Sequence, residues 1–178
     1  FSALQNNDKI GLILFTDQIE LFIPPKKGKS HVLRVIRELL EFKPQGKKTD
    51  IGAALKYLTS VMKKKAIVFV LSDFISAPFL SPLRIAARKH DVTGIRVYDQ
   101  SEAALPNLGM VEMLDRETGE RCLIHTGSKT VRRNHHLAYQ KRVTAFHEAF
   151  SKCGAGTIDC SLQESYVKKL LGYFKNRA

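Results

Sequence analysis

Three polar residues stand where an α/β protein can hold a ligand. Thr49 and Asp50 precede a helical pattern, and Asp73 follows an apolar run of strand length. Ligands of open parallel sheets bind beyond the carboxyl ends of the strands, so Thr49 and Asp73 are expected on adjacent loops there. A hydroxyl and a carboxylate can help to hold a hard cation such as Mg²⁺ or Mn²⁺. The ordinary alternatives are a helix cap for Thr49 and a turn cap for Asp73.

Other reactive patterns are missing or incomplete in this sequence. Gly46-Lys47-Lys48-Thr49 lacks the spacing of a phosphate loop, because Glu41 stands where the first glycine belongs and Lys48 follows the lysine. No Gly-x-Ser-x-Gly elbow occurs. The histidines lack zinc spacing, and no pair of carboxylates suits acid–base catalysis. We therefore expect a protein without enzymatic activity.

Apolar periodicity predicts strands and helices that position these loops. Two strands at residues 10–15 and 19–23 must pair antiparallel because few residues separate them, and Pro24-Pro25 is expected to end the second. A helix follows Thr49-Asp50. The apolar run over residues 66–71 is typical of a parallel strand that is buried on both faces.

Further along the chain, strands and helices continue to alternate. The predicted elements are a helix opened by Ser81-Pro82 with Ser81 as cap, a strand at 92–98, an excursion hairpin at 111–114 and 121–124, a long helix at 131–153, a strand at 157–160 and a final helix. The buried stripe of the final helix is expected to contain Val167, Leu170, Leu171 and Phe174. This order predicts an α/β fold with a mostly parallel sheet, helices on both faces and a single domain over residues 1–178.

Composition narrows the classes of function. The 178 residues include 29 Lys and Arg against 17 Asp and Glu, a formal net charge of +12. This charge suggests anionic partners, but the basic residues are dispersed and no aromatic residues interleave them, so specific nucleic-acid binding is only an alternative. No apolar run approaches the length of a membrane span. Three isolated cysteines fit a reducing compartment, and we expect a cytoplasmic protein.

A specific combination of short stretches runs along almost the whole chain. It includes residues 6–15 and 22–28, Thr49-Asp50-Ile51, Leu71-Ser72-Asp73-Phe74, residues 87–92, 97–99 and 105–106, Asp115-Arg116-Glu117-Thr118-Gly119-Glu120 and Tyr166-Val167-Lys168. This combination closely resembles the bacterial domain-of-unknown-function fifty-eight family, whose members contain a von Willebrand factor A-like domain. The resemblance implies a Rossmann-type sheet and a metal-ion-dependent adhesion site. Such sites combine an Asp-x-Ser-x-Ser segment, a Thr and an Asp, and by matching motifs Thr49 is similar to the Thr and Asp73 to the Asp.

The sequence departs from that family pattern at one point. It contains no Asp-x-Ser-x-Ser segment, which in the family follows the first, central strand and lies upstream of the helix that ends near Asn6-Asn7. We therefore expect the chain to be the C-terminal part of a longer protein, with an incomplete metal site. The sheet is expected to have a gap between the strand at 10–15 and the strand at 66–71.

These observations lead to one functional expectation and two alternatives. The expected function is a non-enzymatic protein-interaction module, in which a partner's acidic residue completes the shell of Mg²⁺ or Mn²⁺ at Thr49 and Asp73. Family members are usually encoded beside MoxR-type AAA+ ATPases, so the resemblance implies an adaptor for such an ATPase. A basic nucleic-acid-binding protein and, less favoured, a metal-dependent hydrolase are the alternatives.

Overall fold

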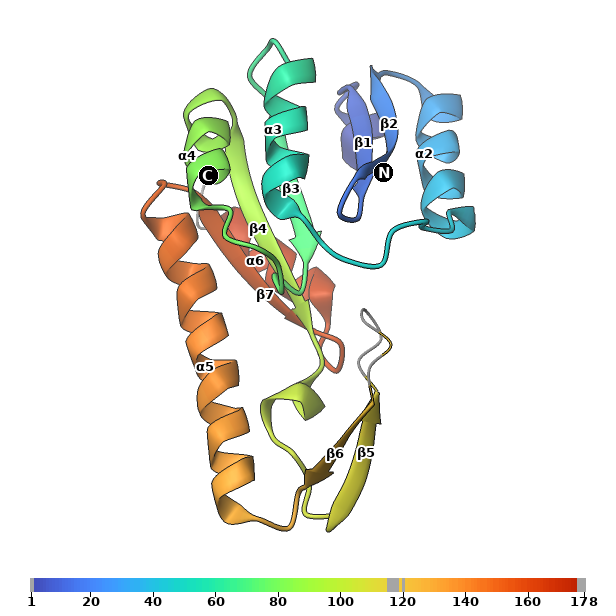
Figure 1. Ribbon diagram of the computed structural model, residues 1–178. Coiled ribbons are helices and arrows are strands. Elements are labelled where there is room, and N and C mark those ends of the chain that lie inside the picture. Colours follow the sequence, from blue (N-terminus) through green and yellow to red (C-terminus); the bar gives the residue numbers. More distant parts are fainter. Residues whose placement is uncertain (1, 115–118, 120, 176–178) are drawn as a thin grey trace.

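The structure is a computed structural model that describes residues 2–114, 119 and 121–175. In chain order the helices and strands are α1 Ser2–Gln5, β1 Ile10–Phe15, β2 Ile19–Lys26, α2 Lys29–Glu41, α3 Ile51–Val61, β3 Ile67–Ser72, α4 Leu80–Lys89, β4 Asp91–Tyr98, the 3₁₀-helix η1 Gln100–Ala103, β5 Met110–Leu114, β6 Arg121–His125, α5 Lys129–Ser151, β7 Gly156–Ser161 and α6 Tyr166–Lys175. Strands and helices alternate as the apolar periodicity predicts (Figure 1).

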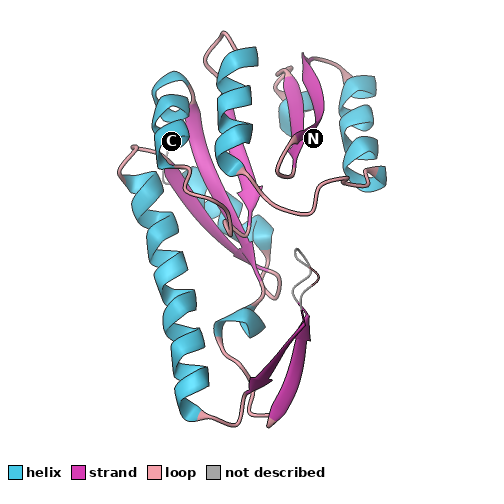
Figure 2. Ribbon diagram, in the orientation of Figure 1, coloured by secondary structure: helices cyan, strands magenta, loops and turns pink. Residues whose placement is uncertain are grey.

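The centre of the molecule is a parallel three-stranded sheet in the order β3-β4-β7. On one of its faces α3, α4 and α5 surround a core that includes Leu55, Leu83, Val92 and Phe150. On the other face α6 packs through Leu170 and Tyr173 against a smaller cluster on β4 and β7. Helices therefore lie on both faces of a parallel sheet, and the predicted α/β class is confirmed (Figure 2).

The first two strands form a separate antiparallel hairpin. β1 pairs only with β2, and within the described residues no strand connects β1 to β3. The gap expected between these two strands is therefore present. The hairpin is followed by α2, and α3 then leads to β3 (Figure 1).

The expected burial of residues 66–71 on both faces is wrong. β3 is an edge strand, and Ile67, Phe69 and Leu71 are 67%, 41% and 60% exposed. Val70 lies between Phe69 and Leu71, points to the opposite face of the strand and is buried in the core. The face of β3 that carries Phe69 is only partly covered, because α6 packs mainly on β4 and β7 and reaches β3 through Phe174.

The predicted buried stripe of the final helix is also largely wrong. Val167, Leu171 and Phe174 of α6 are about half exposed, whereas Leu170 packs against the cluster on β4 and β7. The ring of Phe174 meets Phe69 edge to face, with 5.9 Å between ring centroids. Helical spacing identified the apolar side of α6, but the sheet lacks a surface wide enough to cover it.

Some predicted element boundaries differ from the structure. β2 continues through Pro24-Pro25 to Lys26, which is possible because the pairing with β1 is irregular between Ile10 and Leu12, and a bulge in an edge strand tolerates residues without a backbone donor. α4 begins at Leu80, so Ser81 lies inside the helix and makes no cap. Asn7 takes a left-handed conformation with φ 55° just after α1, as expected for the end of a helix.

The excursion hairpin is present as β5 and β6, which pair antiparallel, and the Asp115–Glu120 loop between them lies almost wholly outside the described residues. This hairpin and the start of α5 form one end of the molecule, away from β1 and β2 (Figures 1 and 2). In the described part of the chain, no helix is both long enough and apolar enough to cross a membrane.

Candidate functional site

The loop before α3 is held by Asp50. Its side chain Oδ1 accepts a hydrogen bond from the backbone N–H of Ala53 at 2.8 Å, which makes Asp50 the cap of α3. Its own backbone N–H donates to the carbonyl of Thr16 at 2.9 Å. The residue that caps α3 is therefore Asp50 and not Thr49. Thr49 lies one residue before the cap and is partly exposed.

The loop after β3 is held by two short side chains. Ser72 Oγ accepts from the N–H of Phe74, and Asp73 Oδ1 accepts from the N–H of Ile75, each at 3.0 Å. Phe74 has φ 61°, a conformation that costs a bulky residue on the order of 1–3 kcal/mol. Its ring packs at 4.4 Å from that of Phe146, and this packing helps to hold the turn in place.

Ser76 joins the two loops. Its Oγ donates to the carbonyl of Thr49 at 3.0 Å and accepts from the N–H of Ile51 at 3.2 Å. The loops that carry Thr49 and Asp73 are therefore adjacent, as the positions of their elements predict. Sequence reasoning did not identify Ser76, and its only signal was its position three residues after Asp73.

These two loops offer few side chains that could bind a metal ion. Asp73 is exposed, with one carboxylate oxygen engaged by the N–H of Ile75. Within residues 2–114, 119 and 121–175, no group of three or more His, Cys, Asp or Glu side chains could hold a metal ion. A cation on Thr49 and Asp73 would therefore take its other oxygens from hydroxyls, backbone carbonyls, water or a partner, which is compatible with Mg²⁺. Joint binding by these two side chains stays a prediction.

Glu20 positions the segment that leads to Thr49. Its Oε1 accepts from the N–H groups of Gly46 at 2.8 Å and Gln45 at 3.1 Å, and from the hydroxyl of Thr16 at 2.8 Å. The hydrogen bond from the Gly46 backbone, followed by that from Thr16, lowers the pKa of the Glu20 carboxyl. A side chain at position 46 would collide with Thr16, so the close approach of the residue 46 backbone to Thr16 requires glycine. The sequence offered no pattern that marks Glu20.

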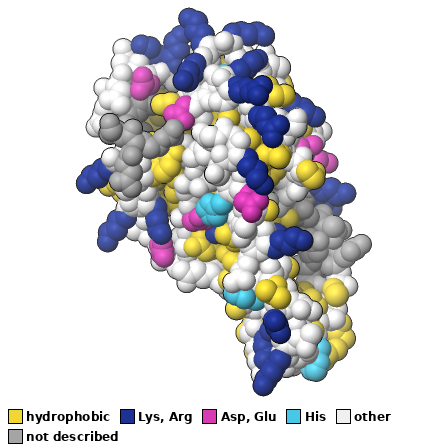
Figure 3. Space-filling model, turned by 90° about the vertical axis from the view of Figure 1, so that its left-hand side faces the viewer, with side chains coloured by type: hydrophobic (Ala, Val, Ile, Leu, Met, Phe, Trp, Pro, Cys, Tyr) yellow, Lys and Arg dark blue, Asp and Glu magenta, His cyan; other side chains and the backbone are white. Residues whose placement is uncertain are grey.

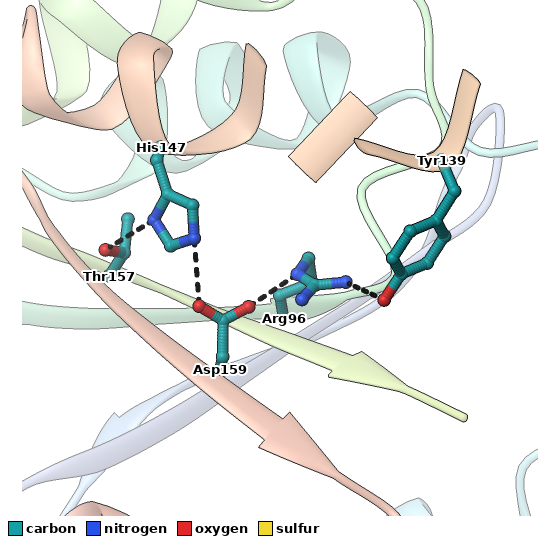
Figure 4. Close-up of polar contacts among 5 residues, drawn as sticks. All are labelled: Arg96, Tyr139, His147, Thr157 and Asp159. Carbon is teal, nitrogen blue, oxygen red and sulfur yellow. Dashed lines mark hydrogen bonds and ion pairs between the residues drawn. The ribbon is translucent and has the colours of Figure 1, made fainter. Parts of the chain in front are cut away.

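A second polar cluster lies between the sheet and α5 (Figure 4). Arg96 Nε donates to Asp159 Oδ1 at 2.6 Å, and Nη1 donates to the hydroxyl of Tyr139 at 3.3 Å. The Arg96 side chain is only 8% exposed, and its guanidinium carbon lies 4.1 Å from the centre of the Tyr98 ring. Burial acts to lower the pKa of Arg96, but hydrogen bonds to Tyr139 and Asp159 outweigh it, and the pKa is raised.

His147 extends this cluster. Its Nε2 lies 2.9 Å from Asp159 Oδ2, and its Nδ1 lies 3.1 Å from the hydroxyl of Thr157. The hydrogen-bonded series Thr157, His147 and Asp159 has the residue types of a catalytic triad, with a hydroxyl, an imidazole and a carboxylate. The hollow beside the cluster instead opens between Asp73, Arg96 and Tyr139, and its lining includes neither Thr157 nor His147. We therefore assign the cluster a structural role that fixes α5 on β4 and β7.

On the one face that Figure 3 draws, the basic side chains are interspersed with acidic and hydrophobic ones. Figure 3 shows Lys and Arg side chains scattered over one face of the molecule, as their spread along the sequence indicates. Such a distribution gives a long-range attraction for anions without the aromatic platform of a single-strand nucleic-acid site.

Residues 1–145 match the family described as "Protein of unknown function DUF58", and the chain belongs to this family. "Uncharacterized protein Mb1516" of Mycobacterium bovis (strain ATCC BAA-935 / AF2122/97) is 25% identical over 115 residues, 63% of this chain. "Uncharacterized protein MAV169" of Mycobacterium avium is 27% identical over 100 residues, 54% of this chain and 59% of its own length. The chain spans 36% of the length of the M. bovis relative.

Two solved structures are similar in fold. One is "conserved hypothetical protein BatB from Bacteroides thetaiotaomicron", with a TM-score of 0.56 and 17% identity over 96% of this chain and 78% of that one. The other is "an aerotolerance-related membrane protein from Bacteroides fragilis NCTC 9343", with a TM-score of 0.54 and 15% identity over 97% of this chain and 81% of that one. At these identities the likeness concerns the fold alone.

Proposed function

We propose that this member of the DUF58 family is a non-enzymatic protein-binding domain, with its docking surface at the carboxyl end of β3 and the start of α3. The observation that carries the proposal is the Ser76 bridge, which holds the Thr49 and Asp73 loops together. The two loops also have little freedom, because Asp50 caps α3 and side chains fix the turn after β3. A rigid polar surface of this kind loses little conformational entropy on binding.

A divalent cation is the proposed link to the partner. Thr49 and Asp73 would each supply one oxygen to Mg²⁺ or Mn²⁺, and an acidic residue of the partner would supply another. Because the partner's oxygen is present only in the complex, docking would stabilise the bound ion and would depend on it. By resemblance to the family we propose a MoxR-type AAA+ ATPase as this partner and the cytoplasm as the location.

We also propose that the fold is von Willebrand factor A-like and that a further strand, from outside the described residues, lies between β1 and β3. The exposed apolar side chains of β3 support this proposal, because natural edge strands are usually protected by charges, proline or a covering element. Amide hydrogen exchange tests it. The β3 amides that do not face β4 should exchange faster in this chain than the equivalent amides in a full-length relative such as the M. bovis protein, of which this chain spans 36%, and equal rates would contradict the added strand.

Calorimetric titration with Mn²⁺ tests the metal site. The chain is compared with Asp73→Ala and with Glu41→Ala, which removes an exposed carboxylate at the end of α2. We expect binding heat that is lost in Asp73→Ala and kept in Glu41→Ala. Heat that survives in Asp73→Ala would contradict the assignment, and a silent titration of all three proteins would exclude a metal-dependent function for residues 1–178.

Sedimentation with a purified MoxR-type ATPase tests the partner. Complex formation should require Mn²⁺, should be reversed by EDTA and should be lost in Asp73→Ala but not in Glu41→Ala. A complex that forms without Mn²⁺, in EDTA and with Asp73→Ala would place the docking surface elsewhere on the domain.

A further inference from the structure

A small hollow opens beside the loop that carries Asp73, between that loop, the end of β4 and the middle of α5. The polar side chains that line it are those of Asp73, Arg96, Tyr98, Glu102, Tyr139 and Arg142. We call it the Arg96 hollow. It measures about 20 Å³, which gives room for one water-sized group such as a carboxylate oxygen.

Arg96 presents an unused donor to this hollow. Its Nε donates to Asp159 at 2.6 Å and its Nη1 to the Tyr139 hydroxyl at 3.3 Å, whereas Nη2 has no hydrogen-bond partner among the described residues (Figure 4). In the described chain, the fully enclosed polar side-chain atoms without partners all belong to His90 and His135, so Nη2 is not sealed off and reaches the hollow. The Arg96 side chain is only 8% exposed, and a charged N–H group at such a place requires an acceptor oxygen.

Three more donors surround the hollow. Arg142 is exposed, and its guanidinium makes no hydrogen bond or ion pair within the described part of the chain. The hydroxyl of Tyr139 accepts from Arg96, which leaves its own hydrogen free to donate, and the hydroxyl of Tyr98 lines the hollow as well. Guanidinium and hydroxyl donors that converge on one point bind a carboxylate oxygen.

The carboxylates on the walls determine when an anion can enter. Asp73 and Glu102 line the hollow, and Asp159 pairs with Arg96 from its other side. Arg96 and Arg142 against these three carboxylates leave a local charge of −1, which disfavours an anion. A divalent cation at Asp73 turns this local charge into +1, which favours an anion. Binding of the cation and binding of the anion therefore strengthen one another.

We propose that the Arg96 hollow binds one oxygen of the partner carboxylate whose other oxygen meets the cation on Thr49 and Asp73. The role of the cation rests on the proposed function, whereas the donors are present in the structure. The first oxygen accepts from Nη2 of Arg96 and from Arg142. A hollow of this size favours the flat carboxylate of an Asp or Glu side chain over a bulkier tetrahedral phosphate.

Acetate is the probe for this hollow because it offers a single carboxylate. NMR spectra of the ¹⁵N-labelled chain are followed during titration with acetate in Mg²⁺, with chloride replaced so that the ionic strength stays constant. We expect saturable shifts of the amides at residues 73–75 and 139–143. Arg142→Gln should weaken acetate binding by about fivefold or more, because it removes a charged donor. The matched control is Arg133→Gln, an exposed arginine nearer the start of α5, which should change the affinity by about twofold or less. Circular dichroism verifies that both variants fold.

The same titration without Mg²⁺ separates this inference from the proposed function. Acetate binding that requires Mg²⁺ and is lost in Asp73→Ala supports both. Acetate binding that depends on Arg142 but ignores Mg²⁺ and Asp73→Ala supports the hollow and removes the cation from it.

Three results overturn the assignment of the hollow. Acetate shifts no amides around it, or Arg142→Gln binds acetate as tightly as the unchanged chain does. In the third, methylammonium and not acetate shifts these amides, which would show that Asp73 and Glu102 make the hollow a site for cations.

Discussion

Arg96 and Asp159 lie 63 residues apart in the chain and meet at 2.6 Å between Nε and Oδ1, where β4 and β7 pair. Asp159 turns its second oxygen to His147, so one carboxylate connects β4, β7 and α5. A buried pair of this kind contributes little net stability against an apolar replacement, but removing one partner leaves a buried charge without compensation. The pair therefore fixes how α5 sits on the sheet.

Asp159→Asn should destabilise the protein by about 3 kcal/mol, because the Arg96 charge stays buried without its counterion. Urea unfolding at pH 7 measures the loss. The control is Glu148→Gln, which removes an exposed ion pair with Lys152 and should have little effect on stability. Equal effects of the two substitutions would show that the Asp159 pair behaves as a surface contact.

Gly94→Ala should cost roughly 1–3 kcal/mol, because the added methyl group would lie 2.5 Å from Cζ of Phe150 in a packed core. Thermal unfolding measures the change. Gly172→Ala on α6 is the matched substitution, since nothing lies within 4 Å of its added methyl group. There alanine should stabilise the helix by up to about 1 kcal/mol. A neutral Gly94→Ala would mean that α5 can shift away from the sheet.

His90 should make the protein less stable as the pH falls below about 6.5. The side chain is 3% exposed, and neither ring nitrogen has a hydrogen-bond partner among the described residues. Burial, assisted by the charge of Lys89, lowers the pKa of His90 below its ordinary value of 6.5. The unfolded chain therefore takes up a proton first, and acid favours unfolding until the pH falls below the folded pKa.

His90→Leu should flatten this dependence when urea unfolding is compared at pH 5 and pH 7, and should not weaken the protein at pH 7 because it removes two buried polar atoms that lack partners. His136→Gln, at an exposed position on α5, should leave the slope intact. An unchanged slope in His90→Leu would assign the acid sensitivity to other groups.

Glu20→Gln should destabilise the protein at pH 7 and lose its effect in acid. The pKa of Glu20 is lowered by hydrogen bonds from the Gly46 backbone and from Thr16, so ionised Glu20 stabilises the fold above the unfolded pKa near 4.5. This stabilisation disappears as the pH falls through the lower folded pKa. Urea unfolding at pH 7 and pH 3 provides the comparison.

Glu38→Gln is the control for Glu20, because the half-buried Glu38 carboxylate lies 3.9 Å from Arg34 one turn earlier on α2 and holds no distant segment in the described part of the chain. It should have little effect at either pH. If Glu20→Gln and Glu38→Gln behave alike, the loop that leads to Thr49 is not held by the Glu20 carboxylate.

Local features of this protein could be predicted from the sequence. Strand and helix periods, the short separation of β1 and β2, and the apolar runs of β3 and β4 are encoded by neighbouring residues, so the elements and their order are confirmed. The adjacency of the Thr49 and Asp73 loops follows from the same order. The family was also predictable, because its characteristic stretches lie along nearly the whole chain.

Burial and long-range pairing were decided by the tertiary structure. The apolar residues of β3 indicate that the strand can be buried, but whether Phe69 is covered depends on which element packs there. In the same way, Glu20 shows no special pattern until the chain returns at Gly46, and Arg96 acquires its partner only when β7 pairs with β4. A residue's own type limits its possible contacts, whereas the arrangement of distant elements selects among them.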